Sequence, residues 1–241
     1  MKIPGWIGEG YSELYSKFRT EEFMFDDAAD FLDRRGQRLR SLLSAMKRNG
    51  LLDVLGRKGY KRIYRLADPA ESALMKGMKI DLSRLPEHVR AVVRTYLRGI
   101  LDRFRERIIS IVLYGSFCRG DYGPESDVDI LLVIDEYEWS EDLGVEGADE
   151  LTYEIWKLRG EYHKVTPYPL TPEQANYHRP LYLDLTKDAV ILYDKDEFIK
   201  RILDEVNAEL VELGAERRTL PDGSWYWDLK PGFELGEVIE I

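Results

Sequence analysis

Two aspartates separated by one residue, Asp127 and Asp129, stand at the start of a continuous apolar run. On a β-strand, side chains two residues apart project to the same face, so the two carboxylates are expected to lie side by side. Neighbouring carboxylates repel each other unless a cation lies between them. Because oxygen donors suit a hard divalent cation, the pair predicts a binding site for Mg²⁺ or Mn²⁺.

A glycine and a serine, Gly115 and Ser116, end another apolar run shortly before the aspartates. That run, IISIVLY at residues 108–114, is typical of a buried strand. A glycine at its end lets the backbone approach a ligand, and a short helix from Phe117 would present free N–H groups. With the Ser116 hydroxyl and the Arg119 guanidinium nearby, the segment predicts a turn that binds phosphate groups.

The elements that must hold this turn in place follow from the pattern of apolar residues. Residues 85–108 have the periodicity of a long amphipathic helix, and Pro86 is compatible with its first turn. This helix leads into the strand at residues 108–114. A turn containing Gly120 and Gly123 then leads into a second buried strand, SDVDILLVI. The predicted order is helix, strand, phosphate-binding turn and strand.

The Gly-Ser pair, followed after a glycine turn by Ser126-Asp127-x-Asp129, resembles the signature of the polymerase β-like nucleotidyltransferase superfamily. Within that superfamily the chain is most similar to the small "minimal" nucleotidyltransferases of archaea and bacteria. The resemblance covers about residues 85–241 and is most specific around residues 113–133.

The resemblance implies an α/β fold of the α+β kind, a small mixed sheet with flanking helices. It also implies Mg²⁺-dependent transfer of a nucleoside monophosphate from a nucleoside triphosphate, in the first place ATP, to an acceptor hydroxyl or similar group. The metal-binding and catalytic roles then fall on Asp127 and Asp129. Nucleotide binding falls on Gly115, Ser116, Arg119 and Ser126.

One part of the superfamily pattern is missing from this sequence. Members carry a third carboxylate on a later strand, which here is expected within residues 161–171. The acid should fall near Lys164 to Thr166, where none is present, and Glu161 lies several residues too early. Since the missing group helps to align and deprotonate the acceptor, its loss should cost orders of magnitude in rate. Nucleotide binding is therefore predicted more strongly than turnover.

A second feature is a strongly basic segment, residues 34–65. It contains eleven lysines and arginines and a single acid, Asp53, which gives a local net charge of about +10 in a chain of net charge −10. The pattern of residues 23–68 predicts a short helix that is capped by Asp26 or Asp27 and ends at Leu32. It also predicts a helix with apolar residues from Leu39 to Met46 and a basic hairpin around residues 56–59.

Helix, basic helix and basic hairpin in this order resemble the winged helix-turn-helix family. The resemblance implies a DNA- or RNA-binding surface on the second helix and the hairpin. A solvated basic face that packs on acidic parts of the chain is the competing interpretation. The residues expected to bind nucleic acid are Arg38, Arg40, Lys47, Arg48, Arg57, Lys58, Lys61 and Arg62.

These patterns predict two domains, a winged-helix-like domain at residues 1–70 and a nucleotidyltransferase-fold domain with a C-terminal helix and tail at residues 71–241. The leading functional hypothesis is nucleotidyl transfer to an unknown acceptor. The first alternative is a nucleic-acid-binding regulator whose degenerate transferase domain senses a nucleotide. A third hypothesis is an antitoxin-like protein that modifies or masks a protein partner.

Several classes of protein are disfavoured by composition. Cys118 is the single cysteine, and the three histidines have no ligand-like spacing, so no zinc site is expected and His163 is interpreted as structural or surface. The sequence has no apolar run of about 20 residues and no charged-then-apolar start, so we expect a cytoplasmic protein without membrane contact. Trp225, Tyr226 and Trp227 in the tail are expected to cover the core, with stacking on a base or an acceptor as the alternative.

Overall fold

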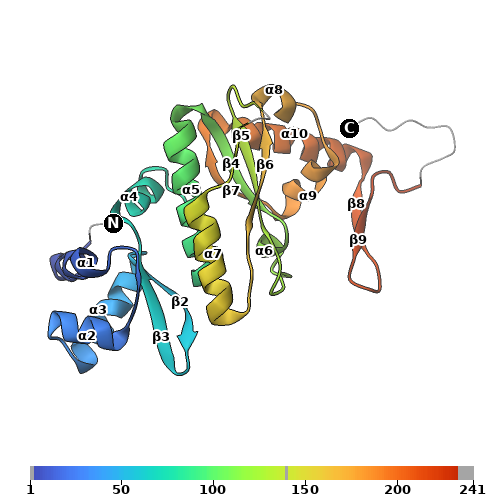
Figure 1. Ribbon diagram of the computed structural model, residues 1–241. Helices are drawn as coiled ribbons and strands as arrows, with labels where there is room; N and C mark the ends of the chain where they lie inside the picture. Colours follow the sequence, from blue (N-terminus) through green and yellow to red (C-terminus); the bar gives the residue numbers. More distant parts are fainter. Residues whose placement is uncertain (1–2, 139–140, 233–241) are drawn as a thin grey trace. The chain divides into compact units, whose positions relative to one another are not determined.

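The computed structural model describes residues 3–138 and 141–232. The chain folds into two compact units, and each unit combines segments that are distant in the sequence (Figure 1). The first unit takes in the residues up to Arg105, Asp121–Val128 and Asp142–Thr166. Of the described residues, the second unit takes in those within Glu106–Gly120, those within Asp129–Glu141 and those from Pro167 onward.

The N-terminal part of the first unit combines helices with a small antiparallel sheet. Its helices are α1 (Gly5–Phe18), α2 (Phe25–Leu32) and α3 (Gly36–Arg48). Its strands, in the order β1-β3-β2, are β1 (Glu22–Met24), β2 (Leu52–Lys58) and β3 (Lys61–Leu66). Figure 1 shows the hairpin of β2 and β3 beside α3. Apolar side chains from all three helices and from the sheet form one core.

The two predicted helices and the basic hairpin are confirmed, with two differences in detail. The hairpin turn lies at Gly59 and Tyr60, because Lys58 pairs with Lys61, and Gly56 lies inside β2 at a bulge. In α2, Asp27 is the third helical residue rather than the N-cap, and its carboxylate accepts a hydrogen bond from the Met24 N–H at 2.7 Å. Helix α1 and strand β1 were not predicted.

Three further helices complete the first unit: α4 (Pro69–Gly77), α5 (Glu87–Phe104) and α7 (Glu146–Arg159). Helix α5, predicted from its periodicity, packs against α7 and β2. Helix α7 also packs against β2, and a side chain larger than that of glycine at position 56 would make a tight contact with α7. A Cβ atom added at Gly56 would lie 3.0 Å from the Cβ atom of Leu158.

Buried charges join β2 and β3 to α4 and α5 within the first unit. The Arg94 guanidinium is paired with Asp53 and, at 3.4 Å, with Glu71, while Arg65 lies 3.6 Å from Glu71. Burial raises the pKa of Asp53, and the neighbouring Arg94 opposes that shift. Two charges of the basic segment, Asp53 and Arg65, are therefore internal. Since they cancel, the exposed residues of the segment keep a net charge of about +10.

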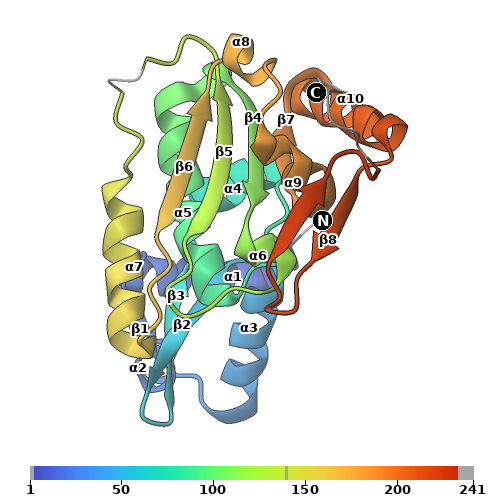
Figure 2. The ribbon, with the colours of Figure 1, turned by 90° about the vertical axis from the view of Figure 1, so that its right-hand side faces the viewer.

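The second unit is built on a mixed four-stranded sheet, shown in Figure 2, with the strand order β6-β5-β4-β7. Strand β4 runs antiparallel to both of its neighbours. The strands are β4 (Ile108–Tyr114), β5 (Val128–Ile134), β6 (Val165–Leu170) and β7 (Val190–Asp194). This arrangement confirms the predicted mixed α/β character and both apolar strands next to the candidate site.

The helices and the sheet of the second unit enclose one continuous apolar core. Strand residues Val112, Leu131 and Val133 pack with Tyr182, Ile199 and other apolar residues of the longer helices. The remaining elements are α6 (Ser116–Arg119), α8 (Pro172–Ala175), α9 (Pro180–Asp188), α10 (Phe198–Leu213), the hairpin β8 (Glu216–Thr219) and β9 (Trp225–Asp228), and the short 3₁₀ turns at 105–107 and 195–197. Among the described residues, no helix combines the length and the apolar character that crossing a membrane requires.

Candidate functional site

The turn between β4 and α6 brings a glycine into direct contact with an aspartate of the motif. Gly115 has φ +76°, and a Cβ atom added there would lie 2.0 Å from Oδ2 of Asp129. Both the backbone conformation and the missing side chain are therefore required at this position. Asp129 faces Tyr114 in the register of β4 and β5 and is half-buried.

The environment of this turn affects the ionisation of Tyr114. Burial and the neighbouring Asp129 raise the pKa of the Tyr114 hydroxyl to about 12. The phenol is therefore protonated at neutral pH and keeps a proton that it can donate beside the carboxylate. Sequence reasoning did not single out Tyr114.

The helix after the turn is only four residues long. Helix α6 spans only Ser116–Arg119, and it closes with a hydrogen bond from the Gly120 N–H to the Ser116 carbonyl at 2.8 Å. A single turn has almost no macrodipole, so the predicted phosphate contact depends mainly on the Ser116 hydroxyl and the Arg119 guanidinium. The Cys118 thiol donates to the Leu113 carbonyl at 3.2 Å.

Ser126 and Asp127 belong to the first unit, and the chain enters the second unit at Asp129. The Ser126 hydroxyl accepts a hydrogen bond from the Gly123 N–H at 2.8 Å and thereby closes the glycine turn. Asp127 is exposed, and no cation among the described residues forms an ion pair with it. Val128, between the two aspartates, donates its N–H to the Lys164 carbonyl at 2.8 Å.

The donor set at this position fits a hard divalent ion. Two carboxylates two residues apart, one exposed and one packed on the backbone of Gly115, offer oxygen ligands of the kind that Mg²⁺ prefers. No histidine or cysteine ligand competes within the motif itself.

The third carboxylate of the superfamily pattern has no counterpart on β6. This strand begins at Val165, and the neighbouring Lys164 and Thr166 offer no acid. Glu161 lies before the strand, and both of its carboxylate oxygens accept hydrogen bonds from the Arg159 side chain at 3.0 Å. Glu161 therefore does not lie on β6, where the missing group is expected.

Arg119, expected to contact phosphate, lies against the C-terminal hairpin. Its guanidinium carbon is 4.6 Å from the ring centroid of Trp225. The indole N–H groups of Trp225 and Trp227 donate to Asp184 Oδ1 at 3.2 and 3.0 Å. These hydrogen bonds fix the hairpin to α9, and Trp227 also packs on the apolar core, in agreement with the expectation that the tail covers the core.

The basic residues predicted to bind nucleic acid fall into two groups. Some have partners: Lys47 pairs with Glu87 at 2.9 Å, Lys61 pairs with Asp26 at 2.6 Å, and the Arg48 guanidinium donates to the Ser44 hydroxyl at 3.3 Å. The others are exposed and have no acidic partner among the described residues: Arg38, Arg40, Arg57, Lys58 and Arg62.

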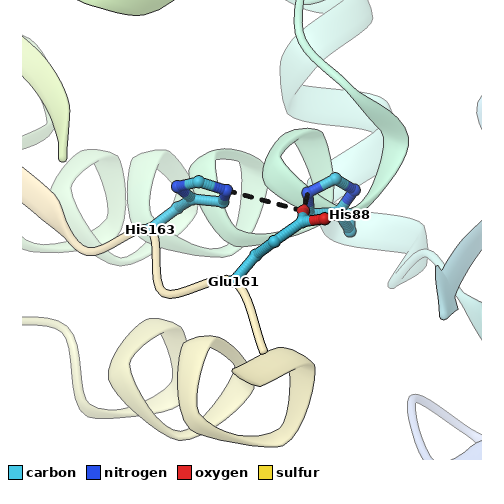
Figure 3. A group of neighbouring side chains, drawn as sticks. All are labelled: His88, Glu161 and His163. Carbon is cyan, nitrogen blue, oxygen red and sulfur yellow. Dashed lines mark ion pairs between the residues drawn. The ribbon is translucent and has the colours of Figure 1, made fainter. Parts of the chain in front are cut away.

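A cluster that sequence reasoning missed lies within the first unit (Figure 3). One potential ligand atom from each of His88, Glu161 and His163 lies within 4.8 Å of the other two. The Nε2 atom of His88 is 2.9 Å from Glu161 Oε2, and the Nε2 atom of His163 is 3.7 Å from the same oxygen. We call these three residues the histidine–glutamate cluster.

The electrostatic surroundings of the cluster favour a neutral imidazole and an ionised carboxylate. Burial, reinforced by the positive charge of Arg159, lowers the pKa of His88 to about 4. The hydrogen bonds from Arg159 hold the pKa of Glu161 below its usual value.

No spacing rule could have identified this cluster. His88 lies in the first turn of α5, whereas Glu161 and His163 lie in the segment that connects α7 to β6. The spacing of the histidines along the sequence gives no sign that two of them lie close together in the fold. The only usable signal was the Glu-x-His alternation at residues 161–163, because alternate residues of an extended segment share a face.

Comparison with known proteins identifies the family. Residues 94–216, just over half of the chain, match the nucleotidyltransferase domain family. The chain belongs to this family.

Two relatives come from Methanocaldococcus jannaschii. The chain is 44% identical over 43 residues to "Putative protein adenylyltransferase MJ0604", a match that covers 18% of this chain and 43% of that protein. It is 27% identical over 90 residues to "Putative protein adenylyltransferase MJ0141", a match that covers 36% of this chain and 91% of that protein. The chain thus spans less than half the length of the first relative.

A solved toxin–antitoxin structure with AMP-PNP also matches, with a TM-score of 0.28 and 14% identity over 49% of this chain and 90% of that chain.

Proposed function

We propose that this protein transfers AMP from ATP to a macromolecular acceptor, in the first place a protein hydroxyl group. Membership of the nucleotidyltransferase domain family and the names of the two relatives support this class of reaction. The observation that carries the proposal is the packing of Asp129 against Gly115, where only a glycine leaves room for the carboxylate.

Each residue of the motif has a role in the proposed reaction. Asp127 and Asp129 would hold Mg²⁺, which when bound supplies positive charge to the triphosphate. The Ser116 hydroxyl and the Arg119 guanidinium would donate to the phosphate oxygens. In the reaction, the acceptor oxygen forms a bond to the α-phosphorus, the bond to the bridging oxygen breaks, and pyrophosphate leaves. The acceptor gives up its proton as this bond forms.

The missing acid on β6 limits the expected rate. Without a carboxylate beside the acceptor hydroxyl, solvent would have to receive the proton, and orientation of the acceptor would depend on other contacts. We therefore propose an enzyme with slow turnover rather than one with rates typical of its superfamily.

The test uses ATP labelled at the α-phosphate, Mg²⁺ and the purified chain, with protein and RNA fractions as acceptors. We expect label to be retained on the protein fraction and to be lost when Asp127→Asn and Asp129→Asn are combined. The matched control combines Asp135→Asn with Glu136→Gln, which removes the same charge at the other, exposed end of β5. Loss of label in the control as well, or its persistence in the motif variant, would contradict the site assignment.

A second candidate function is nucleic-acid binding with nucleotide sensing, supported by a cavity of about 740 Å³ along α3. Its lining includes Arg40, Ser44, Arg48 and Arg62, and several exposed cations of this region have no acidic partner among the residues that the structure describes. In this proposal residues 1–70 form a winged-helix-like domain and residues 71–241 form the nucleotidyltransferase-fold domain. Exposed cations of this kind favour a polyanionic ligand.

The second candidate is tested by the salt dependence of DNA and RNA binding. We expect the combined Arg38→Gln, Arg40→Gln, Arg57→Gln and Lys58→Gln variant to lose affinity and to reduce the salt slope by about 4. Unchanged affinity would contradict the assignment of this surface. A mobility shift that responds to ATP, without any labelled product, would favour the regulator over the enzyme.

A further inference from the structure

The geometry of the histidine–glutamate cluster points to a second metal site, and we propose that it binds a divalent transition metal ion of the zinc type. The ligands are the Nε2 atoms of His88 and His163 and a carboxylate oxygen of Glu161. None of these residues belongs to the Asp127–Asp129 motif. The proposal does not depend on transfer activity.

The distances in the cluster fit a single ion after a small movement. Imidazole nitrogen and carboxylate oxygen lie about 2.0–2.2 Å from zinc, so two donors on one ion are at most about 4 Å apart. The separations of 2.9 and 3.7 Å from Glu161 Oε2 satisfy this limit. The largest separation is at most 4.8 Å, and a side-chain movement of less than about 1 Å would close it.

The orientation of His163 is fixed by a backbone carbonyl. Its Nδ1 atom lies 2.8 Å from the Ser126 carbonyl oxygen. Because a carbonyl can only accept, Nδ1 carries the proton, and in the neutral ring Nε2 keeps a lone pair toward Glu161 (Figure 3). Histidine ligands of metals commonly donate their other ring N–H in this way.

The carboxylate ligand is also supported from behind. Arg159 donates to both oxygens of Glu161 at 3.0 Å and holds the carboxylate in one orientation. A carboxylate has about four acceptor positions, so these hydrogen bonds leave a lone pair of Oε2 for an ion. Supporting partners of this kind typically change metal affinity by about 10- to 100-fold.

Backbone hydrogen bonds bring the ligand segment to the motif turn within the first unit. The Tyr162 N–H donates to the Pro124 carbonyl at 2.7 Å, and the Val128 N–H donates to the Lys164 carbonyl at 2.8 Å. The alternation of Glu161 and His163 places both side chains on one face of this paired segment, toward His88. A bound ion would therefore hold the beginning of α5 and the turn that carries Ser126 together.

A cavity of about 560 Å³ within the first unit gives an ion a route of access. His88 and Glu161 lie in its lining, together with Arg57, Arg62 and Arg159. Three side-chain ligands leave at least one position of a four-coordinate ion open toward this cavity. The cations of the lining favour an anionic group, such as inorganic phosphate, at that position.

The donor set separates this site from the Mg²⁺ site. Imidazole suits zinc, cobalt, iron and copper, whereas Mg²⁺ prefers oxygen ligands. Two histidines with one carboxylate therefore select a different ion from the two aspartates.

The experiment uses the full chain after treatment with a chelator and titrates it with Zn²⁺, with Co²⁺ as a spectroscopic probe. We expect one zinc ion per chain, cobalt absorption bands typical of nitrogen and oxygen ligands, and a rise in Tm of about 5 °C or more at saturating zinc. Mg²⁺ in large excess should not displace the zinc. Absence of binding in the unaltered chain would overturn the proposal and would leave the cluster as a packed structural contact.

Variants assign the ligands. His88→Gln and Glu161→Gln are each expected to weaken zinc binding at least about tenfold. His178→Gln is the matched control, because His178 lies in the second unit and pairs with Glu209 at 3.2 Å. The combined Asp127→Asn and Asp129→Asn variant should bind zinc as the unaltered chain does. Unchanged zinc affinity in His88→Gln, or its loss in the motif variant, would overturn the proposal.

NMR of the unaltered chain tests the assigned ligands even if the variants do not fold. The sequence has only three histidines, so their imidazole C–H signals can be followed individually by NMR. We expect zinc to shift two of the three signals and to leave that of His178 in place. Shifts of all three signals, or of none, would contradict the assigned ligands.

Discussion

The two candidate sites of this protein differ in how the chain assembles them. Nearly all of the Asp127–Asp129 site comes from one continuous stretch, residues 115–129, which contains the turn predicted to bind phosphate and both carboxylates. The histidine–glutamate cluster joins the beginning of α5 to the segment before β6. The first site can be recognised as a motif, whereas the second exists only once α5, α7 and the ligand segment have packed together.

This difference explains why the residues of the first site can be predicted from the sequence and those of the second cannot. A motif on one stretch constrains residue types at fixed spacing, so Gly115, Ser116 and the two aspartates can be named from the order of residues alone. A cluster assembled by packing constrains no spacing, so its histidines look unrelated in the sequence. The two sites also use different donors, two carboxylates in one and two imidazoles with a carboxylate in the other, and should therefore respond to different ions.

The largest expected effect is on the binding of Mn²⁺–ATP, which should depend on the two aspartates and not on the histidine–glutamate cluster. Combining Asp127→Asn with Asp129→Asn should lower the affinity for Mn²⁺–ATP at least about 100-fold, because both oxygen ligands lose their charge. The measurement is the electron paramagnetic resonance signal of free Mn²⁺ in the presence of ATP. A variant that still binds Mn²⁺–ATP like the unaltered chain would remove the distinction between the two sites.

The next prediction tests whether the Asp127–Asp129 site depends on the close contact between Gly115 and Asp129. Gly115→Ala should lower transfer activity by about tenfold or more, because the new Cβ atom would displace the Asp129 carboxylate. Gly120→Ala is the matched control: Gly120 also has a positive φ, of +83°, but nothing among the described residues lies within 4 Å of its Cβ position.

Both glycine variants should lose about 1 kcal/mol or more of stability through backbone strain, while only Gly115→Ala should lose activity. Thermal unfolding and label transfer, measured in parallel on the two variants, check this expectation. Equal activity in both would show that the contact with Asp129 has no role.

A smaller effect concerns Asp68, which contacts α5, the helix that carries His88 of the histidine–glutamate cluster. Asp68 caps α4 through a hydrogen bond from the Ala70 N–H at 2.8 Å, accepts from the Tyr15 hydroxyl at 2.8 Å, and pairs with Arg98 of α5 at 3.1 Å. Burial acts to raise the pKa of Asp68, but these partners outweigh it and hold the pKa below its usual value. Asp68→Ala should lower the free energy of unfolding by about 1 kcal/mol.

The sign of the pH dependence follows from that lowered pKa. The unfolded chain protonates Asp68 more readily than the folded chain, so the stabilisation is present above about pH 4 and is lost as the pH falls further. Urea unfolding between pH 3 and pH 6 checks this. The unaltered chain and Asp68→Ala should converge in stability at the acidic end, and a constant difference across the range would contradict the assigned partners.

The smallest effect tests whether the two sites communicate. His163→Gln removes the imidazole whose Nδ1–H donates to the carbonyl of Ser126, next to Asp127. We expect about a twofold loss in Mg²⁺–ATP affinity, since one neutral hydrogen bond contributes only modestly. Isothermal titration with His178→Gln as control is the measurement, and a loss of the same size in the control would contradict coupling through Ser126.

The elements around the local site could be predicted because their apolar patterns are long and regular. Residues 108–114 and the run after Ser126 read as buried strands, and both are strands in the structure. Helix α5 was equally clear. In contrast, α1 and β1 have no strong apolar pattern and were not predicted. The hairpin turn was predicted too early in the sequence, because Gly56 lies at a bulge of β2 against α7 and not in a turn.

Charges were the least predictable feature of the candidate sites. The charge count of the basic segment does not show which charges are exposed, and Arg65 and Asp53 are buried in a network with Arg94. Lys47 and Lys61 have acidic partners. Which cations remain exposed depends on residues far away in the sequence, such as Glu87, so only the fold could show it.

Parallel incubations with ATP labelled at the α-phosphate and ATP labelled at the γ-phosphate test the central claim most directly. Nucleotidyl transfer retains the α-label on the acceptor and releases the γ-label in pyrophosphate. The account predicts α-label on the acceptor, no γ-label, and loss of the α-label when Asp127 and Asp129 are both replaced by asparagine. Retention of the γ-label on the acceptor, or transfer that is unaffected by the two replacements, would contradict it.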